Sequence, residues 1–211
     1  MRRILAIVPA TLVLIALAGC VPAAVEPSAA PSPRASAEAS ATQTPDAAPE
    51  PLAISECETM LPLILARQVL SANTEFLGES AAADFGGWFA VPEIQAALTS
   101  APQSRLCRWG VPNSDGTFAL VVAELPAAEQ AAVIGALIAA GFVSSTSGAE
   151  TSGTETMLRL EQEGIVSLEA QTHIFTGDVW VLVDGTSGEL TDTVSGFALD
   201  VLRAANPTLS F

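Results

Sequence analysis

Residues 177–183 read GDVWVLV, a turn signal followed by five apolar residues. Successive side chains of a β-strand point to opposite faces, so the three valines share one face, and Trp180 and Leu182 share the other. A strand that is apolar on both faces is covered on both faces. The segment therefore predicts the central strand of a sheet.

Four other segments have the composition of strands separated by turns. They are residues 105–111, 117–124, 154–161 and 165–175. Asn113-Ser114-Asp115-Gly116, between the first two, has the composition of a hairpin turn. The sequence thus predicts a two-stranded hairpin and, later in the chain, three antiparallel strands that include the central one.

Helices are predicted on either side of these strands. Pro126 opens one that continues to Ala140 and ends at Gly141, and a short one is expected over residues 92–98. The last helix, residues 189–205, has the capping-box spacing Thr186-x-x-Glu189 and stops at Asn206-Pro207. Its apolar residues recur on one stripe, which needs a sheet to cover it. The stripe consists of Leu190, Val194, Phe197 and Val201.

A first helix is predicted over residues 55–70. Ser55-Glu56-Cys57-Glu58 has the capping-box spacing, and Pro62 either kinks this helix or opens its main segment. Helices and strands in this order predict an α+β fold, an α/β sandwich in which an antiparallel sheet is covered by helices.

The start of the chain has the features of an export signal. Met1-Arg2-Arg3 precede an apolar segment over residues 4–18. A helix of that length spans about 22 Å, which is shorter than the roughly 30 Å hydrocarbon core of a bilayer. The segment is therefore predicted to be a signal peptide and not a membrane span.

Two cleavage sites compete at its end. Ala16-Leu17-Ala18 is an A-x-A site that would release a soluble protein beginning at Gly19. Leu17-Ala18-Gly19-Cys20 resembles the bacterial lipobox, whose cysteine receives a lipid and becomes the first mature residue. An exported chain with three cysteines leaves one thiol unpaired unless Cys20 is lipidated. We therefore expect residues 1–19 to be a lipoprotein signal peptide and Cys20 to anchor the chain at the extracytoplasmic face of the cell membrane.

The residues after Cys20 have the composition of a linker. Residues 21–50 contain six prolines and ten alanines and little large apolar surface with which to offset the entropy of ordering. Residues 20–50 are therefore predicted to be the lipidated cysteine and a disordered tether, the alternative being a segment that binds the cell wall or a partner. Residues 51–211 are predicted to form a single domain.

The charge of the chain limits its partners. Eight arginines, no lysine and 23 acidic residues give a net charge of −15. This charge repels nucleic-acid phosphates and anionic lipid head groups. We therefore expect no nucleic-acid partner, and a membrane association through the lipid anchor alone.

Several of these features occur together in a known group of proteins. Besides the lipobox and the tether, the chain has a cysteine in the first helix, a Cys107-Arg108-Trp109 strand and a Gly-Asp-x-Trp strand. The combination resembles the small lipoproteins of unknown function that are common in actinobacteria. Some of their relatives are similar to sensor domains of membrane kinases, and others to the oxygen-evolving subunit P-like sandwich. The resemblance implies no catalytic residues.

The search for chemistry finds no familiar motif. The sequence has no G-x-S-x-G, P-loop or G-x-G-x-x-G motif, and we predict no catalytic residue, metal site or cofactor. His173, the only histidine, is expected to be a structural polar residue; the alternative is a general base in a triad with a distant serine and aspartate. Four aspartates are expected on solvated surfaces and not in a calcium loop. They are Asp178, Asp184, Asp192 and Asp200.

Two pairs of residues are candidates for a structural or binding role. With Cys20 lipidated, Cys57 and Cys107 can pair only with each other, and the absence of C-x-x-C spacing favours a structural disulfide over a redox pair. Trp88 and Phe89 follow paired glycines in a predicted loop. They are candidates for the wall of a ligand groove, and the alternative is that they fill the core.

These observations predict a non-enzymatic, lipid-anchored extracytoplasmic module that binds a ligand or a protein partner in the cell envelope. One alternative is a secreted hydrolase of unfamiliar type, which would need a pocket that places His173 near an acid and a hydroxyl. The other is an envelope spacer or assembly factor without a ligand pocket.

Overall fold

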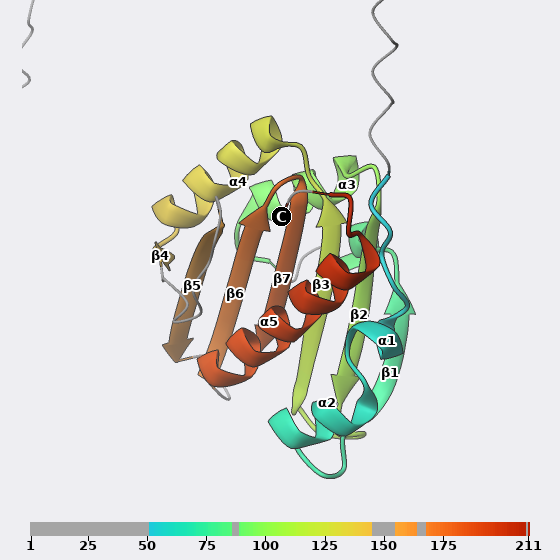
Figure 1. The fold of residues 1–211 in the computed structure, drawn as a ribbon. Coiled ribbons are helices and arrows are strands. Elements are labelled where there is room, and N and C mark those ends of the chain that lie inside the picture. The colour runs from blue at the N-terminus through green and yellow to red at the C-terminus, as the bar shows by residue number, and fades with distance from the viewer. Residues whose placement is uncertain (1–50, 86–88, 145–154, 164–167, 210) are drawn as a thin grey trace, which may run out of the picture. The chain divides into compact units, whose positions relative to one another are not determined.

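The computed structural model describes residues 51–85, 89–144, 155–163, 168–209 and 211 (Figure 1). Cys20, the predicted signal peptide, the predicted linker and Trp88 lie outside these residues. The described strands are β1 (Glu75–Ser80), β2 (Ser104–Gly110), β3 (Thr117–Glu124), β4 (Val143–Ser144), β5 (Thr156–Glu163), β6 (Leu168–Thr176) and β7 (Val179–Gly185). The helices are α1 (Cys57–Met60), α2 (Leu63–Val69), α3 (Pro92–Ser100), α4 (Ala127–Ala139) and α5 (Gly188–Ala205), with a short 3-10 helix, η1 (Ala82–Phe85).

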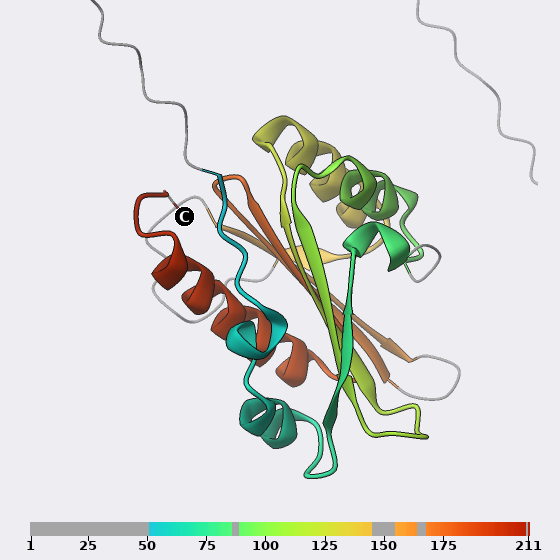
Figure 2. The same ribbon diagram turned by 90° about the vertical axis from the view of Figure 1, so that its right-hand side faces the viewer.

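The described strands form one antiparallel sheet between two layers of helices. Helices α1, α2 and α5 pack on one face, and α3 and α4 pack on the other, as Figure 2 shows with the sheet seen nearly edge-on. Each face has its own cluster of buried apolar side chains. The predicted α+β sandwich is confirmed.

Strand β7 lies at the centre of this sheet. The strand order is β1-β2-β3-β7-β6-β5-β4, and β7 pairs with β3 and β6 along its length. Its three valines belong to the apolar cluster under α5, whereas Trp180 and Leu182 belong to the cluster under α3 and α4. The prediction of a central strand covered on both faces is confirmed.

The long C-terminal helix forms as predicted, but with a different cap. The N-cap is Ser187, whose hydroxyl accepts a hydrogen bond from the Leu190 backbone N–H, so the predicted cap at Thr186 is wrong by one residue. Leu190 and Val194 are buried against the sheet, while Phe197 and Val201 are half-buried at the edge of the same cluster.

The first helix is split in two. Ser55 caps nothing, because α1 begins after Glu56 and no side chain caps it. Helix α1 ends at Met60, and Pro62 is the N-cap of α2. Of the two predicted roles for Pro62, the structure shows the second, since the ring removes a backbone donor where a continuous helix would need one.

Two strands at the edges of the sheet were not predicted. Strand β1 alternates only between exposed and half-buried positions, and a bulge between Phe76 and Gly78 interrupts its pairing with β2. Gly78 there has a φ of 128°, a conformation that favours glycine. Strand β4 is two residues long. Polar composition and short length leave such edge strands without an apolar pattern.

Candidate functional site

Phe89, predicted to line a groove or to fill the core, lies in the core. Its side chain is 8% exposed and belongs to the cluster that includes Val91 and Ile94 under α3. Trp88, the other half of that prediction, lies outside the described residues. The two residues that follow Phe89, Ala90 and Val91, line the cavity described below, so the predicted loop borders a cavity without Phe89 forming its wall.

The predicted cysteine pair is brought together. The sulfur atoms of Cys57 in α1 and Cys107 in β2 are 2.03 Å apart and the Cα atoms 5.5 Å apart, the geometry of a disulfide. Both residues are buried in the same cluster as Trp109, so the bond connects the first helix to the sheet beside a tryptophan. The carboxylate of Glu79, which is paired with Arg105 at 2.6 Å, lies 3.4 Å from the Cys57 sulfur.

His173 is fully buried in β6, within a group of aromatic rings. Its ring stacks with Phe175 and Trp180 and meets Phe142 edge-on. The Trp180 Nε1–H donates to His173 Nδ1 at 3.3 Å, so Nδ1 is an acceptor and the proton lies on Nε2. Burial lowers the His173 pKa to about 3, and the ring is neutral.

Both ring nitrogens of His173 are therefore occupied inside the protein. Its Nε2–H points to the amide oxygen of Gln171, 3.4 Å away. This arrangement leaves neither nitrogen to take a proton from a hydroxyl group. The geometry agrees with the predicted structural role and not with a general base in a triad.

The hydrogen bonds continue from His173 to a carboxylate. Gln171 uses its amide nitrogen to donate to Asp184 Oδ2 at 2.7 Å. Trp180, His173, Gln171 and Asp184 thus form one chain in which each donor points toward the carboxylate. Asp184 was predicted to be a solvated turn residue, and this prediction is wrong because β7 continues to Gly185 and holds Asp184 half-buried in the sheet. Asp192, also half-buried, contacts Thr172 and Arg159.

Strand pairing explains why this chain of hydrogen bonds ends at Asp184, where the covering helices leave the sheet open. One row of residues across the sheet is buried and apolar apart from His173, and α3 and α4 cover it: Leu106, Val121, Leu182, His173 and Leu158. The next row, two residues along each strand, contains Arg108, Ala119, Asp184, Gln171 and Leu160. In Figure 2, α3 and α4 lie over one end of this face only.

At this second row the sheet borders a cavity of about 340 Å³. The polar lining residues are Gln162, Glu169, Gln171 and Asp184, which come from β5, β6 and β7. The apolar lining residues are Leu160 and, from the segments flanking α3 and α4, Ala90, Val91, Ala140 and Phe142. Aliphatic and aromatic walls with a few convergent polar groups are typical of small-molecule sites.

Asp184, one of the two acidic residues that line this cavity, has a raised pKa. Burial raises the pKa of the Asp184 carboxyl to about 6, the hydrogen bond from Gln171 opposes this rise, and the charge of Glu169 adds to it. Glu169 and Asp184 are diagonal neighbours on adjacent strands, a separation of about 7 Å along the sheet. Carboxyl groups with a perturbed pKa in a cavity are candidates for a functional site.

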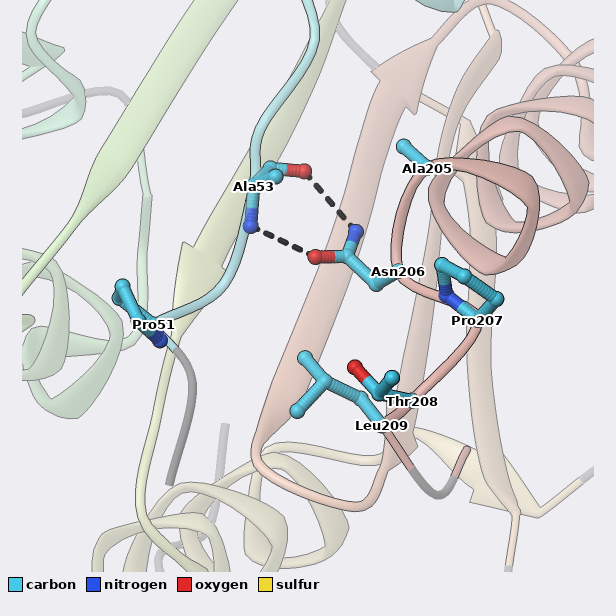
Figure 3. A pocket seen from close by; sticks show the side chains of 7 residues that line it. All are labelled: Pro51, Ala53, Ala205, Asn206, Pro207, Thr208 and Leu209. Carbon is cyan, nitrogen blue, oxygen red and sulfur yellow. Dashed lines mark hydrogen bonds between the residues drawn. The ribbon is translucent and has the colours of Figure 1, made fainter. Parts of the chain in front are cut away.

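A second cavity, of about 290 Å³, lies where the first described residues meet the end of α5 (Figure 3). Asn206 closes it with three hydrogen bonds: its Oδ1 accepts from the Ala53 N–H, and its Nδ2 donates to the carbonyls of Ala53 and Leu202. These bonds use both ends of the amide inside the protein. Asn206 therefore connects the first described residues of the domain to its last helix.

Sequence reasoning missed the polar residues of the first cavity. Glu169, Gln171 and His173 alternate along β6, so they share one face of a predicted strand. This alternation is the signal that the sequence offers for the polar side of the cavity. Within the described part of the chain, no three His, Cys, Asp or Glu side chains are grouped so as to hold a metal ion.

Comparison of the chain with family models, curated proteins and solved structures found no match. The resemblance to actinobacterial lipoproteins therefore stays a prediction. None of the described helices combines the length and apolar character that a bilayer crossing requires.

Proposed function

We propose that this protein is a lipid-anchored binding module of the cell envelope, whose ligand enters the cavity between β5, β6, β7 and the segments flanking α3 and α4. In this proposal Cys20 carries the lipid and residues 21–50 tether the domain to the extracytoplasmic face of the membrane. The signal-like N-terminus and the cysteine count support the anchor, and a buried disulfide fits a compartment where disulfides persist.

The observation that carries the binding proposal is the hydrogen-bond chain that ends at Asp184. A buried histidine and a glutamine are used to fix one carboxylate at the border of a cavity. Burial of the Asp184 carboxylate disfavours its charged form and so lowers the stability of the fold. Packing alone does not require an acid at this position. Such an arrangement is typical of groups held in place for a ligand.

The test is a fragment screen on the full chain by NMR, with neutral, anionic and cationic fragments. We expect the methyl resonances of Val91 and Leu160 to shift with at least one fragment class. Leu160→Trp, which fills the cavity, should abolish these shifts at Val91, whereas Val143→Trp on the exposed edge strand β4 should not. A screen in which no fragment perturbs the cavity would contradict the proposal and favour a spacer without a ligand.

A hydrolase is the second candidate, because of one specific observation. Glu169 and Asp184 place two carboxyl groups in one cavity, and the pKa of one is raised to about 6. Glycoside hydrolases use a carboxyl group with a raised pKa beside a second carboxylate. Incubation with chromogenic glycosides tests this candidate, since activity that disappears in both Glu169→Gln and Asp184→Asn would favour it over binding alone.

A further inference from the structure

We infer that the ligand of this cavity is a small organic cation, an ammonium group on an apolar body, and this inference rests on the proposed function. The cavity has two chemically different sides. Glu169 and Asp184 lie on the sheet side, while Val91 and Phe142 come from the segments that flank the covering helices. A ligand that fits both sides carries a polar, positively charged end and an apolar end.

The hydrogen bonds inside the cavity leave acceptors available. Asp184 Oδ2 accepts from Gln171, and the amide oxygen of Gln171 is occupied by His173. Within the described part of the chain, Asp184 Oδ1 and the Glu169 carboxylate accept no hydrogen bond and form no ion pair. Glu169 is exposed and Asp184 is half-buried. Ionised carboxylates only accept, so a ligand that bonds to them donates, and an ammonium group supplies three donors together with the compensating charge.

Among the described residues, no arginine forms an ion pair with the carboxylates of this cavity. Arg159 lies on β5 between two residues that face the cavity side, so it points to the opposite face, where it pairs with Glu161 and Asp192. Arg108 is exposed on β2 and shares the row of Asp184, with Ala119 between them. Two strand spacings place the backbones of Arg108 and Asp184 about 10 Å apart.

A metal ion fits the lining less well than an organic cation does. Calcium takes six to eight oxygen ligands. The polar lining offers two carboxylates and two amides, and the amide oxygen of Gln171 already accepts from His173, which leaves at most five side-chain oxygens, two from each carboxylate and one from Gln162. Apolar side chains make up the rest of the described lining, and they gain contact only with an apolar ligand surface. Phe142, buried at the border of the cavity, adds aromatic carbon to this apolar lining.

The raised pKa of Asp184 provides an independent readout. Among the described residues, the titratable groups near it are Glu169 on β6, His173 behind Gln171, and Arg108 across β3. The described lining residues from the flanking segments, Ala90, Val91, Ala140 and Phe142, do not titrate. An ammonium ion binds the ionised carboxylate. Affinity should therefore rise about tenfold between pH 5 and pH 7, as Asp184 ionises with a pKa of about 6.

The experiment compares three probes of nearly equal size and different charge: benzylammonium, benzyl alcohol and benzoate. Each is titrated into the full chain at pH 7, and the methyl resonances of Val91 and Leu160 are followed by NMR. We expect benzylammonium to bind with a Kd on the order of 1 mM, as befits so small a ligand, and the other two to bind at least tenfold more weakly.

Variants assign the effect to the cavity. Asp184→Asn should weaken benzylammonium binding at least tenfold and remove its pH dependence. Asp178→Asn removes the same charge from the exposed turn at the other end of β7, and it should leave binding unchanged. Equal binding of benzyl alcohol or benzoate, or full affinity in Asp184→Asn, would overturn the cation inference while the binding function stands. If no probe or screening fragment shifts the cavity resonances, the binding function fails as well.

Discussion

The side-chain amide of Gln171 donates a 2.7 Å hydrogen bond to the carboxylate of Asp184, its pairing partner on the neighbouring strand. This bond lowers the pKa of Asp184, against the burial that raises it to about 6. Gln171 also accepts from His173, so one side chain connects the buried ring to the cavity.

Replacing Gln171 should change the pKa of Asp184. In Gln171→Leu, Asp184 loses its donor, and its pKa should rise further above the ordinary value. The measurement is a ¹³C NMR titration of the Asp184 carboxyl carbon. Gln162→Leu is the matched control, because Gln162 lines the same cavity and forms no hydrogen bond with Gln171 or Asp184. An unchanged pKa in Gln171→Leu would show that the hydrogen bond is unimportant in solution.

His173 should make the protein less stable in acid. Its pKa falls from 6.5 in the unfolded chain to about 3 in the folded one, so the unfolded state binds the proton first. The contribution of His173 is complete above pH 6.5 and declines by up to about 1.4 kcal/mol per pH unit as the pH falls toward 3. The free energy of unfolding of the wild type minus that of His173→Leu should therefore shrink from pH 7 to pH 4.5, as urea unfolding can measure.

Asp184 changes the free energy of unfolding in the opposite direction over part of this pH range. Because its folded pKa is raised, its contribution to stability is greatest below pH 3.8 and is lost as the pH rises through 6. Asp184→Asn should thus gain stability relative to the wild type between pH 4 and pH 7. Asp184 is present in both the wild type and His173→Leu, so its contribution cancels in their difference. A difference that does not depend on pH would contradict the assignment of His173 as a buried neutral ring.

The bond between Cys57 and Cys107 should contribute strongly to stability. It closes a loop with a sequence separation of 50, for which the chain-entropy model gives roughly 4 kcal/mol. Changing both cysteines to serine should lower the free energy of unfolding by up to this amount. Alkylation of the unreduced protein followed by mass spectrometry tests the bond itself, and modification of both residues without prior reduction would show that it is absent.

Sequence reasoning succeeded where the apolar pattern was dense. The run from Val179 to Val183 is apolar on both faces and predicted a central strand, and Pro126 and Gly141 mark the two ends of α4. These signals are local and arise from burial and backbone geometry. The layered fold follows from them, because apolar faces on strands and helices have few ways to cover one another.

The cavity could not be predicted in the same way. It forms because the register of three strands places Leu160, Gln171 and Asp184 in one row, with Gln162 and Glu169 paired in the next, and because the helices stop short of these rows. Register depends on pairing between distant segments, which a single sequence does not show. An aspartate before a glycine is a turn signal, and only the pairing of Asp184 with Gln171 and Ala119 shows that the strand includes it.

The two glycines of α5 should respond in opposite ways to alanine. At Gly188 an added Cβ would collide with the guanidinium of Arg159, which lies against the helix start and bonds to Glu161 and Asp192. Gly188→Ala should therefore cost about 1 kcal/mol, a modest figure because the displaced ion pairs are partly exposed. Gly196 has open space around its Cα, so Gly196→Ala should stabilise the helix by up to about 1 kcal/mol.

Thermal unfolding of the two variants measures this difference. A double variant, Gly188→Ala with Arg159→Ala, tests the cause, since the glycine change should then cost little. Equal stabilisation by both glycine changes would mean that Arg159 moves aside at no cost.

The anchor predicted at Cys20 has a direct test. In the proposed function this thiol carries the lipid, and one acyl chain binds a membrane only marginally whereas two hold it stably. Cys20→Ser should therefore abolish fatty-acid labelling and move the protein from the membrane fraction to the medium, or leave its signal peptide uncleaved. The domain should still fold with Cys57 paired to Cys107, so its unfolding temperature serves as the control. Unchanged labelling and fractionation in Cys20→Ser would refute the anchor, and cleavage after Ala18 in the wild type would show that the competing A-x-A site is used.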